Sequence, residues 1–279
     1  MKIGFWQLEK GHGCSTANLA AIATNIALKT NLRSVVMQSQ YENNNLMQSF
    51  YVNKKQGSSE AIGEQGIDEL VRLLMSRKND RDEIAATTYS FLGGKFNLLY
   101  ETFKVNGELY YRDLQTCYDK ILNAFSSIYD ITFIDIEAGM SDLSVALMKE
   151  CDYVVYNLSQ EKVLLDKLFS SGLIDYDKAI FIIGNYDAES SLSYKNISRT
   201  YKNIGSGNLF VLPHCAAYSN AINSTSVMKF INSNISDRNL INIGKLKLTK
   251  LTTTGYVEEF MICLDRISKE ILELMGLKL

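Results

Sequence analysis

The first 28 residues constrain the fold more than any other stretch, because they place a glycine-spaced turn between a strand and a helix. The apolar run at 2–7 predicts a β-strand, and the run at 17–28, which lacks Gly and Pro, predicts a helix. The turn between them has the sequence Gly11-His12-Gly13-Cys14-Ser15-Thr16. Glycines let backbone N–H groups surround an anion at a helix N-terminus, so this order is typical of a phosphate-binding loop.

One position of this turn departs from the phosphate-binding pattern. Such a loop ends Gly-Lys-Ser/Thr, and Cys14 stands in the place of the lysine. Ser15 keeps the hydroxyl group that binds Mg²⁺ in such loops. The sequence therefore predicts a phosphate-binding scaffold without tight triphosphate binding or turnover. The alternative is an ordinary strand–turn–helix unit that binds nothing.

Composition excludes several classes of protein. Of the 279 residues, 46% are apolar and 22% charged, which is typical of a soluble globular protein with a full core. The net charge of -2 gives no general basicity for nucleic acid. The 5 cysteines are scattered without a C-x-x-C pair, and neither a signal peptide nor a membrane-spanning segment is evident, so we expect a cytoplasmic protein.

Strands and helices alternate regularly along the chain. The strands expected after the first one lie at 34–37, 96–100, 129–135, 152–157, 179–185 and 208–212. Helices are expected at 67–75, 82–89, 110–125, 142–149, 162–170 and 194–201, with 46–66 irregular. This alternation predicts an α/β fold, a doubly wound and mostly parallel sheet with helices on both faces. Its ligand would bind at the carboxyl ends of the strands.

The last part of the chain has three expected elements. A helix is expected at 218–232, and the strictly alternating run at 245–251 predicts an edge strand or an extended basic arm. The apolar stripe of 257–275 predicts a helix that packs on the body, the alternative being a membrane-surface or partner-binding helix. We therefore expect an α/β domain at 1–235, followed by an arm and helix at 236–279 that pack on the same domain.

The order of these motifs resembles the ParA/MinD family of P-loop NTPases over roughly residues 1–235, and within it the divergent TadZ/CpaE-like branch. The family's deviant loop, Lys-Gly-Gly-x-Gly-Lys-Thr/Ser-Thr, matches Glu9–Thr16. By this resemblance the nucleotide-binding residues of the loop would be Lys10, Gly11, His12, Gly13, Cys14, Ser15 and Thr16. The family's signature lysine falls on Glu9, and Lys10, one place later, would be its substitute.

The resemblance also assigns residues outside the loop. Ser15 and Asp135 would hold Mg²⁺, and Asn185 and the loop after Pro213 would contact the nucleotide base. The carboxylates of the family's Asp-x-Asp-Pro motif are replaced by Gln38 and Gln40. The resemblance implies ATP or ADP with Mg²⁺ as cofactor, a homodimer, protein partners in a larger assembly, and DNA as a further partner.

Three functions follow from these residues. The preferred one is a non-catalytic or weakly ATP-binding protein that positions or regulates an assembly such as a pilus, secretion system or replicon. The second is an active ATPase for plasmid or chromosome partition or cellular positioning, which uses Lys10. The third is a redox or transfer enzyme in which Cys14, at a helix N-terminus and near His12, has a lowered pKa. Glu137 is a candidate to share the site of Asp135, whereas His214 is expected to be a loop residue.

Overall fold

Eight strands form the centre of the fold in the computed structural model, which describes residues 1–41, 45–50, 66–76, 80–100, 102, 104–204, 207–235 and 253–277. The strands are β1 (Lys2–Trp6), β2 (Ser34–Gln38), β3 (Thr88–Phe91), β4 (Phe96–Leu99), β5 (Ile131–Asp135), β6 (Tyr153–Leu158), β7 (Ala179–Tyr186) and β8 (Leu209–Pro213). Their order is β3-β4-β2-β5-β1-β6-β7-β8, and every neighbouring pair is parallel except β3 and β4. The predicted doubly wound sheet is confirmed.

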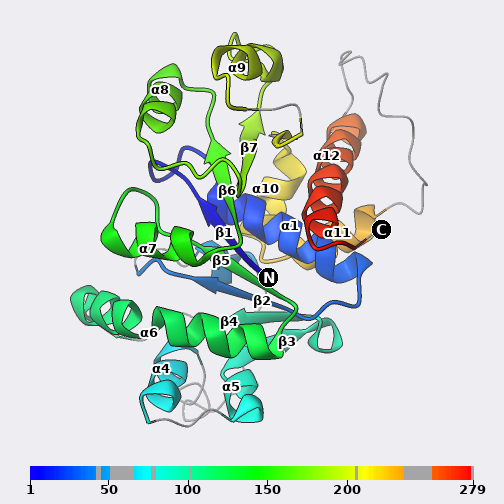
Figure 1. Cartoon of the computed structure of the whole chain (residues 1–279). Coiled ribbons are helices and arrows are strands. Elements are labelled where there is room, and N and C mark those ends of the chain that lie inside the picture. The colour runs from blue at the N-terminus through cyan, green and yellow to red at the C-terminus, as the bar shows by residue number, and fades with distance from the viewer. Residues whose placement is uncertain are drawn as a thin grey trace.

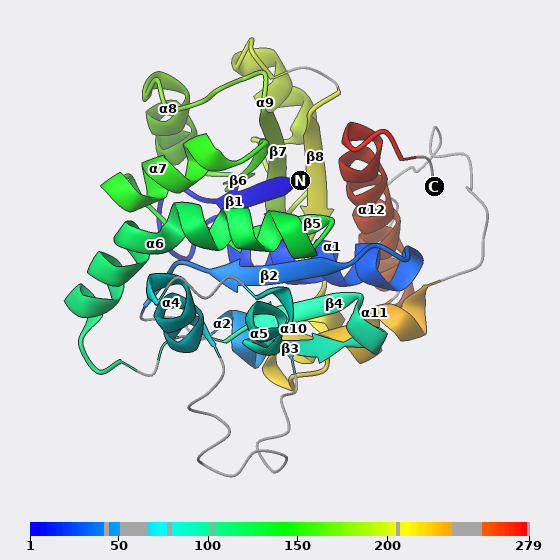
Figure 2. The same ribbon diagram turned by 60° about the horizontal axis from the view of Figure 1, so that its bottom comes forward.

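Helices cover both faces of this sheet (Figures 1 and 2). One face carries α4 (Ile67–Met75), α5 (Arg81–Ala86), α6 (Gly107–Ile128), α7 (Asp142–Glu150), α8 (Lys162–Ser170) and α9 (Tyr194–Thr200). The other carries α1 (Ser15–Lys29), α2 (Asn45–Gln48), α10 (Ala216–Asn223), α11 (Val227–Asn234) and α12 (Thr253–Leu274). A short 3₁₀ turn, η1 (Leu92–Gly94), joins β3 to β4. Within the part of the chain that the structure describes, every helix is too short or too polar to span a lipid bilayer.

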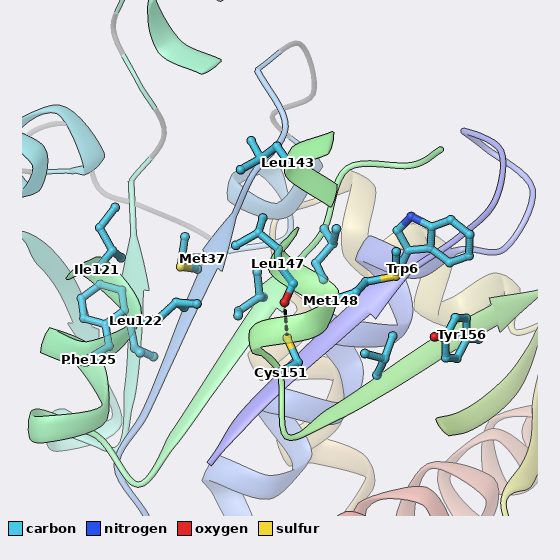
Figure 3. Packing of buried hydrophobic residues seen from close by; sticks show 14 of the residues in the cluster. Trp6, Met37, Ile121, Leu122, Phe125, Leu143, Leu147, Met148, Cys151 and Tyr156 are labelled. Atoms are coloured by element: carbon cyan, nitrogen blue, oxygen red, sulfur yellow. Dashed lines mark hydrogen bonds between the residues drawn. The ribbon is translucent and has the colours of Figure 1, made fainter. Parts of the chain in front are cut away.

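The two cores follow from the alternation of side chains along each strand. On β1, Ile3 and Phe5 face the α1 layer, whereas Trp6 faces the α6 layer. Figure 3 shows the core on the α6 face, in which side chains of α6 and α7 lie around Met37 of the sheet and Trp6 lies near Tyr156. Because both faces are buried, the central strands are nearly continuous apolar runs, as expected for a parallel sheet.

Two predicted helices differ from the structure. The helix predicted at 82–89 ends at Ala86, and Tyr89 lies in β3, where it pairs with Leu98 of β4. The single helix predicted at 218–232 is divided into α10 and α11 at a turn in which Thr225 has a left-handed φ of 53°. That conformation interrupts helical hydrogen bonding, and no Gly or Pro marks it. The predicted strand or arm at 245–251 lies outside the described residues.

The long helix α12 packs against β8, α1, α10 and α11. The ring of Phe260 stacks on that of Tyr218, with 4.8 Å between centroids. Asn25 Nδ2 of α1 donates hydrogen bonds to Asp265 Oδ1 at 2.9 Å and Ser268 Oγ at 3.0 Å. Apolar packing and this polar contact together hold α12 to the helix that begins at the glycine-spaced loop.

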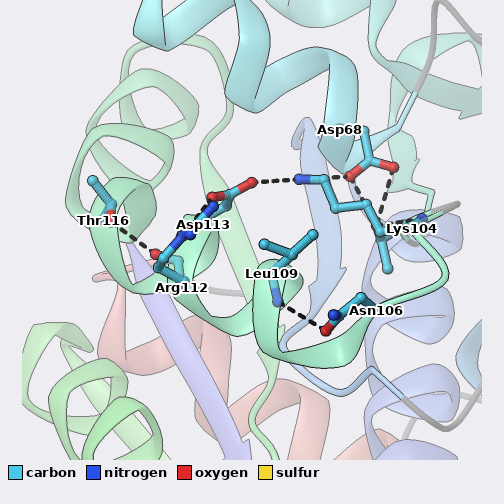
Figure 4. A network of polar contacts seen from close by, with 8 residues as sticks. Asp68, Lys104, Asn106, Leu109, Arg112, Asp113 and Thr116 are labelled. Atoms are coloured by element: carbon cyan, nitrogen blue, oxygen red, sulfur yellow. Dashed lines mark hydrogen bonds and ion pairs between the residues drawn. The ribbon is translucent and has the colours of Figure 1, made fainter.

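A polar network fixes the start of α6 (Figure 4). Lys104 Nζ lies 2.6 Å from Asp113 Oδ2 and 3.4 Å from Asp68 Oδ1, so it links α6 to α4. The Asn106 side chain accepts the backbone N–H of Glu108 at 2.8 Å and caps the helix. This network holds the N-terminus of α6 at the carboxyl edge of the sheet, the edge at which β1 meets the loop.

Candidate functional site

The glycine-spaced loop leaves β1 at Trp6 and enters α1 at Ser15, at the carboxyl edge of the sheet. Two glycines allow the close packing around it. A Cβ atom on Gly13 would lie 2.4 Å from the Asn157 carbonyl oxygen, and one on Gly184 would lie 2.6 Å from the Gly13 carbonyl oxygen. The ends of β6 and β7 therefore press directly on the loop, and a larger residue at either glycine would displace it.

The side chain of Gln7 fills the inside of the loop. Its Oε1 accepts hydrogen bonds from the backbone N–H groups of Gly13 at 2.9 Å and Ser15 at 3.3 Å. In a phosphate-binding loop, backbone N–H groups of this kind point at the anion. The protein's own amide oxygen thus occupies donors that a phosphate oxygen would use. Sequence reasoning missed Gln7, since its only signal was its position between the strand and the loop.

Asp135 lies at the end of β5 beside the start of α1, and it is 1% exposed. Thr16 Oγ1 donates to Asp135 Oδ2 at 2.6 Å, and Ser15 Oγ donates to Oδ1 at 3.3 Å. Burial raises the pKa of Asp135 to about 7, although these hydroxyl groups oppose the rise. The structure therefore brings together Ser15, Thr16 and Asp135, as the sequence predicts.

The two glutamines that replace the family's carboxylates also lie at this edge. Gln40 Nε2 donates to Asp135 Oδ2 at 3.1 Å. Gln38 lies next to Asp135 in the register of β2 and β5 and is 4% exposed. Glu137 does not share the site, because its carboxylate accepts the hydroxyl of Tyr111 on α6. Asp135 is therefore surrounded by neutral donors rather than by further carboxylates.

Two ion pairs hold the tip of the loop to α8. Glu9 Oε1 lies 2.7 Å from Lys167 Nζ, and the Lys167 hydrogen bond lowers the pKa of Glu9. His12 Nδ1 lies 2.7 Å from Glu161 Oε1, and this contact raises the pKa of His12. Glu9, which stands in the place of the family's signature lysine, therefore forms an ion pair with Lys167 of the same chain.

The hypothesis of an activated thiol at Cys14 is wrong. Burial raises the pKa of Cys14, so the thiol stays protonated near neutral pH. His12, the candidate base, is bonded to Glu161 instead.

Asn185 and Pro213 lie at the ends of β7 and β8, on the same edge as the loop. Asn185 is exposed and has a left-handed φ of 51°, and its Oδ1 lies 2.6 Å from His214 Nδ1. Pro213 is the last residue of β8 and is in register with Tyr186. Gly184, which precedes Asn185, lies against Gly13 and Cys14 of the loop, and His214 is the hydrogen-bond partner of Asn185.

The residues present fit Mg²⁺ better than they fit phosphate. Ser15 and Asp135 offer oxygen atoms, and a cation would relieve the buried charge of Asp135. Phosphate oxygens, in contrast, would compete with Gln7 for the N–H groups of the loop. The hollow beside the loop, between Leu8 and Leu165, has a volume of only about 20 Å³, enough for about one water molecule. Among the described residues, no group of three or more His, Cys, Asp and Glu side chains could hold a metal ion.

Comparisons with known proteins identify the fold. No sequence-family model matches the chain, and no curated protein sequence matches it. A ParA family ATPase from Chlorobium tepidum is 12% identical, with a TM-score of 0.67, over 94% of this chain and 98% of that one. The septum site-determining protein MinD of Pyrococcus horikoshii, complexed with Mg-ADP, is 11% identical, with a TM-score of 0.65, over 99% and 98%. A chain of the MinC:MinD cell division complex of Aquifex aeolicus is 13% identical, with a TM-score of 0.61, over 100% and 98%.

Because the sequence identities are low, these similarities show only that the fold is shared. The eight-stranded, mostly parallel sheet with helices on both faces matches the ParA/MinD P-loop NTPase fold.

Proposed function

We propose that this chain is a ParA/MinD-fold protein that positions or regulates a larger assembly by binding partners, with little or no ATP hydrolysis. The assembly would be a pilus, a secretion system or a replicon. The observation that carries this proposal is the Gln7 side chain, whose oxygen accepts the N–H groups of Gly13 and Ser15. Because these N–H groups already have an acceptor within the chain, the conformation of the loop depends less on a bound nucleotide.

The chemistry of phosphoryl transfer supports the absence of turnover. Such catalysis consists of positioning and charge neutralisation, and lysines carry much of the neutralisation. Here the loop lysine is Cys14, and Glu9, in the place of the signature lysine, is paired with Lys167. Gln40 replaces a carboxylate and donates to Asp135. These changes remove charge from the positions that would stabilise the transition state.

ATP or ADP with Mg²⁺ remains the proposed ligand of this edge, bound weakly. Ser15 and Asp135 would hold the ion, the loop from Lys10 to Thr16 the phosphates, and Asn185 and Pro213 the base. The MinD structure with Mg-ADP supports this assignment by fold likeness alone. Phosphate binding would require the Gln7 side chain to leave the loop, which lowers the affinity by the free energy of its two hydrogen bonds, about 1 kcal/mol each.

Partner binding at this same edge is supported by exposed apolar side chains. They belong to the starts of α6 and α8 and to the turn after β5, with exposed fractions of 97% for Val105, 40% for Leu109, 49% for Met140 and 77% for Val163. Exposed apolar side chains at these turns are available for contact with another protein. We propose a homodimer and a second protein of the assembly as partners, with DNA as the less supported alternative. All five cysteines are free thiols, which supports a cytoplasmic location.

Calorimetry of ATP and ADP with Mg²⁺, together with steady-state ATP turnover, tests the proposal. We expect no turnover above background and, at most, millimolar binding that Asp135→Ala removes. The double variant Gln7→Ala/Cys14→Lys frees two N–H donors and restores the loop lysine, so it should bind at least about tenfold more tightly. ATP turnover by the native protein that is lost in Lys10→Ala would overturn the proposal in favour of an active ATPase.

A further inference from the structure

A second and larger hollow lies at the opposite edge of the sheet from the loop. It has a volume of about 170 Å³, against about 20 Å³ beside the loop. The hollow lies where the amino ends of β6, β7 and β8 meet the C-terminal half of α12, and Figure 2 shows β8 beside α12. One water molecule needs about 10–15 Å³, so this hollow is large enough for a small organic group.

The walls of this pocket combine aromatic rings with carboxylates. Tyr153, Tyr176 and Phe210 supply the rings, whereas Asp177 and Glu270 supply the carboxylates. Aromatic faces attract organic cations, and carboxylates bind their charged ends. An apolar stem with a positive end, as in an alkylammonium or alkylguanidinium group, matches both features at once.

A cation of the protein itself already lies on one of these rings. The guanidinium carbon of Arg266 is 5.7 Å from the centroid of the Phe210 ring. Arg266 and Glu270 are one turn apart on α12, yet neither Asp177 nor Glu270 is in an ion pair within the part of the chain that the structure describes. The carboxylates of the pocket are therefore available to a ligand, while Arg266 opposes it by its like charge.

We propose that this pocket binds an aliphatic organic cation of the amine or guanidinium class. Its apolar stem lies against Tyr153, Tyr176 and Phe210, and its charged end lies between Asp177 and Glu270. The pocket lies at the amino ends of the strands and the loop lies at their carboxyl ends. Binding in the pocket therefore needs no nucleotide and is independent of the function proposed above. The side chain of a lysine or arginine in a partner protein and a free small amine share this chemistry.

An NMR titration of the full chain with n-butylamine and with n-butanol, which has the same stem without the charge, tests this proposal. We expect n-butylamine to shift the amide signals of residues 207–210 and 270–274 saturably, and to bind at least about fivefold more tightly than n-butanol. Equal affinities of the two probes would overturn the proposal. N-acetyl-lysine methylamide that binds more tightly than n-butylamine assigns the pocket to a partner's side chain, and equal binding assigns it to a free amine.

Three variants on α12 sharpen the test. Glu270→Gln should weaken n-butylamine binding about fivefold, and Arg266→Gln should strengthen it, because one removes an attraction and the other a repulsion. Glu273→Gln changes the same charge on the same helix outside the pocket, so it should leave the affinity unchanged. Equal effects of Glu270→Gln and Glu273→Gln, or weaker binding in Arg266→Gln, would contradict the proposal. Urea unfolding of each variant checks that its fold is intact.

Discussion

Replacing Asp135 with Asn tests whether ionisation of this buried carboxyl group lowers the free energy of unfolding. The pKa of Asp135 is raised from its ordinary 3.8 to about 7 because the side chain is buried. Each tenfold change in proton affinity corresponds to about 1.4 kcal/mol, so ionisation of Asp135 lowers the free energy of unfolding by up to about 4 kcal/mol. The amide that replaces the carboxyl group in the Asp135→Asn variant cannot ionise, and it keeps an oxygen for the hydroxyl groups of Ser15 and Thr16.

The direction of the pH dependence follows from which state holds the proton. Between the two pKa values the folded state keeps the proton of Asp135, whereas the unfolded state has lost it. The stability that Asp135 contributes is therefore complete below about pH 4 and is lost as the pH rises through about 7. From about pH 5 to about pH 8, the native protein should lose about 2 to 3 kcal/mol of unfolding free energy that the variant does not lose.

Urea unfolding at several pH values measures this difference. Trp6 is the only tryptophan and is fully buried, so its fluorescence reports global unfolding. The stability of Asp135→Asn relative to the native protein should grow steadily across this pH range. Asp119→Asn, which removes an exposed carboxylate on α6, should run parallel to the native protein. A constant difference between Asp135→Asn and the native protein would refute the reasoning.

Three further predictions follow from the packing around the loop. Gly13→Ala should lower the free energy of unfolding by about 1 to 3 kcal/mol in urea, because its Cβ would lie 2.4 Å from the Asn157 carbonyl oxygen. Cys14 should react slowly with iodoacetamide at pH 7, more slowly than a free thiol, since burial raises its pKa; mass spectrometry of the labelled peptide, with Cys14→Ser as control, measures the rate. Phe260→Ala should destabilise the protein by about 3 to 5 kcal/mol and release α12 to proteolysis, whereas a change at the exposed Tyr256 should do neither.

The sheet could be predicted from the sequence because its strands carry a strong and local signal. The run from Ile131 to Asp135 is buried at every position, and such runs are typical of strands in a parallel sheet. The edge strand β3 gave no such signal. It is four residues long, follows a helix after one residue, and depends on pairing with β4 for its existence.

The site was predictable at the positions where the backbone alone sets the geometry. The ends of β1, β5 and β7 meet at one edge of any sheet with this order, so the loop, Asp135 and Asn185 could be placed together. The contacts that decide the chemistry depend on side-chain orientation and on distant segments. Glu9 and Lys167 are 158 positions apart, and no local pattern shows that α8 lies against the loop.

The Gln7 contact and the absence of the loop lysine act together on phosphate binding. In a loop that awaits a phosphate, inward N–H groups need an acceptor, and without one each carries a cost of about 1–3 kcal/mol. Gln7 supplies that acceptor to Gly13 and Ser15 from within the chain. A phosphate that binds here would replace the hydrogen bonds of Gln7 with its own, so these bonds add little to the free energy of binding. Only the charge of the phosphate would add to it, and that charge would meet Cys14 in place of a lysine and the nearby carboxylate of Asp135. The same Gln7 contact that weakens nucleotide binding thus keeps the loop ordered without a nucleotide, which is the property that a permanent partner-binding surface requires.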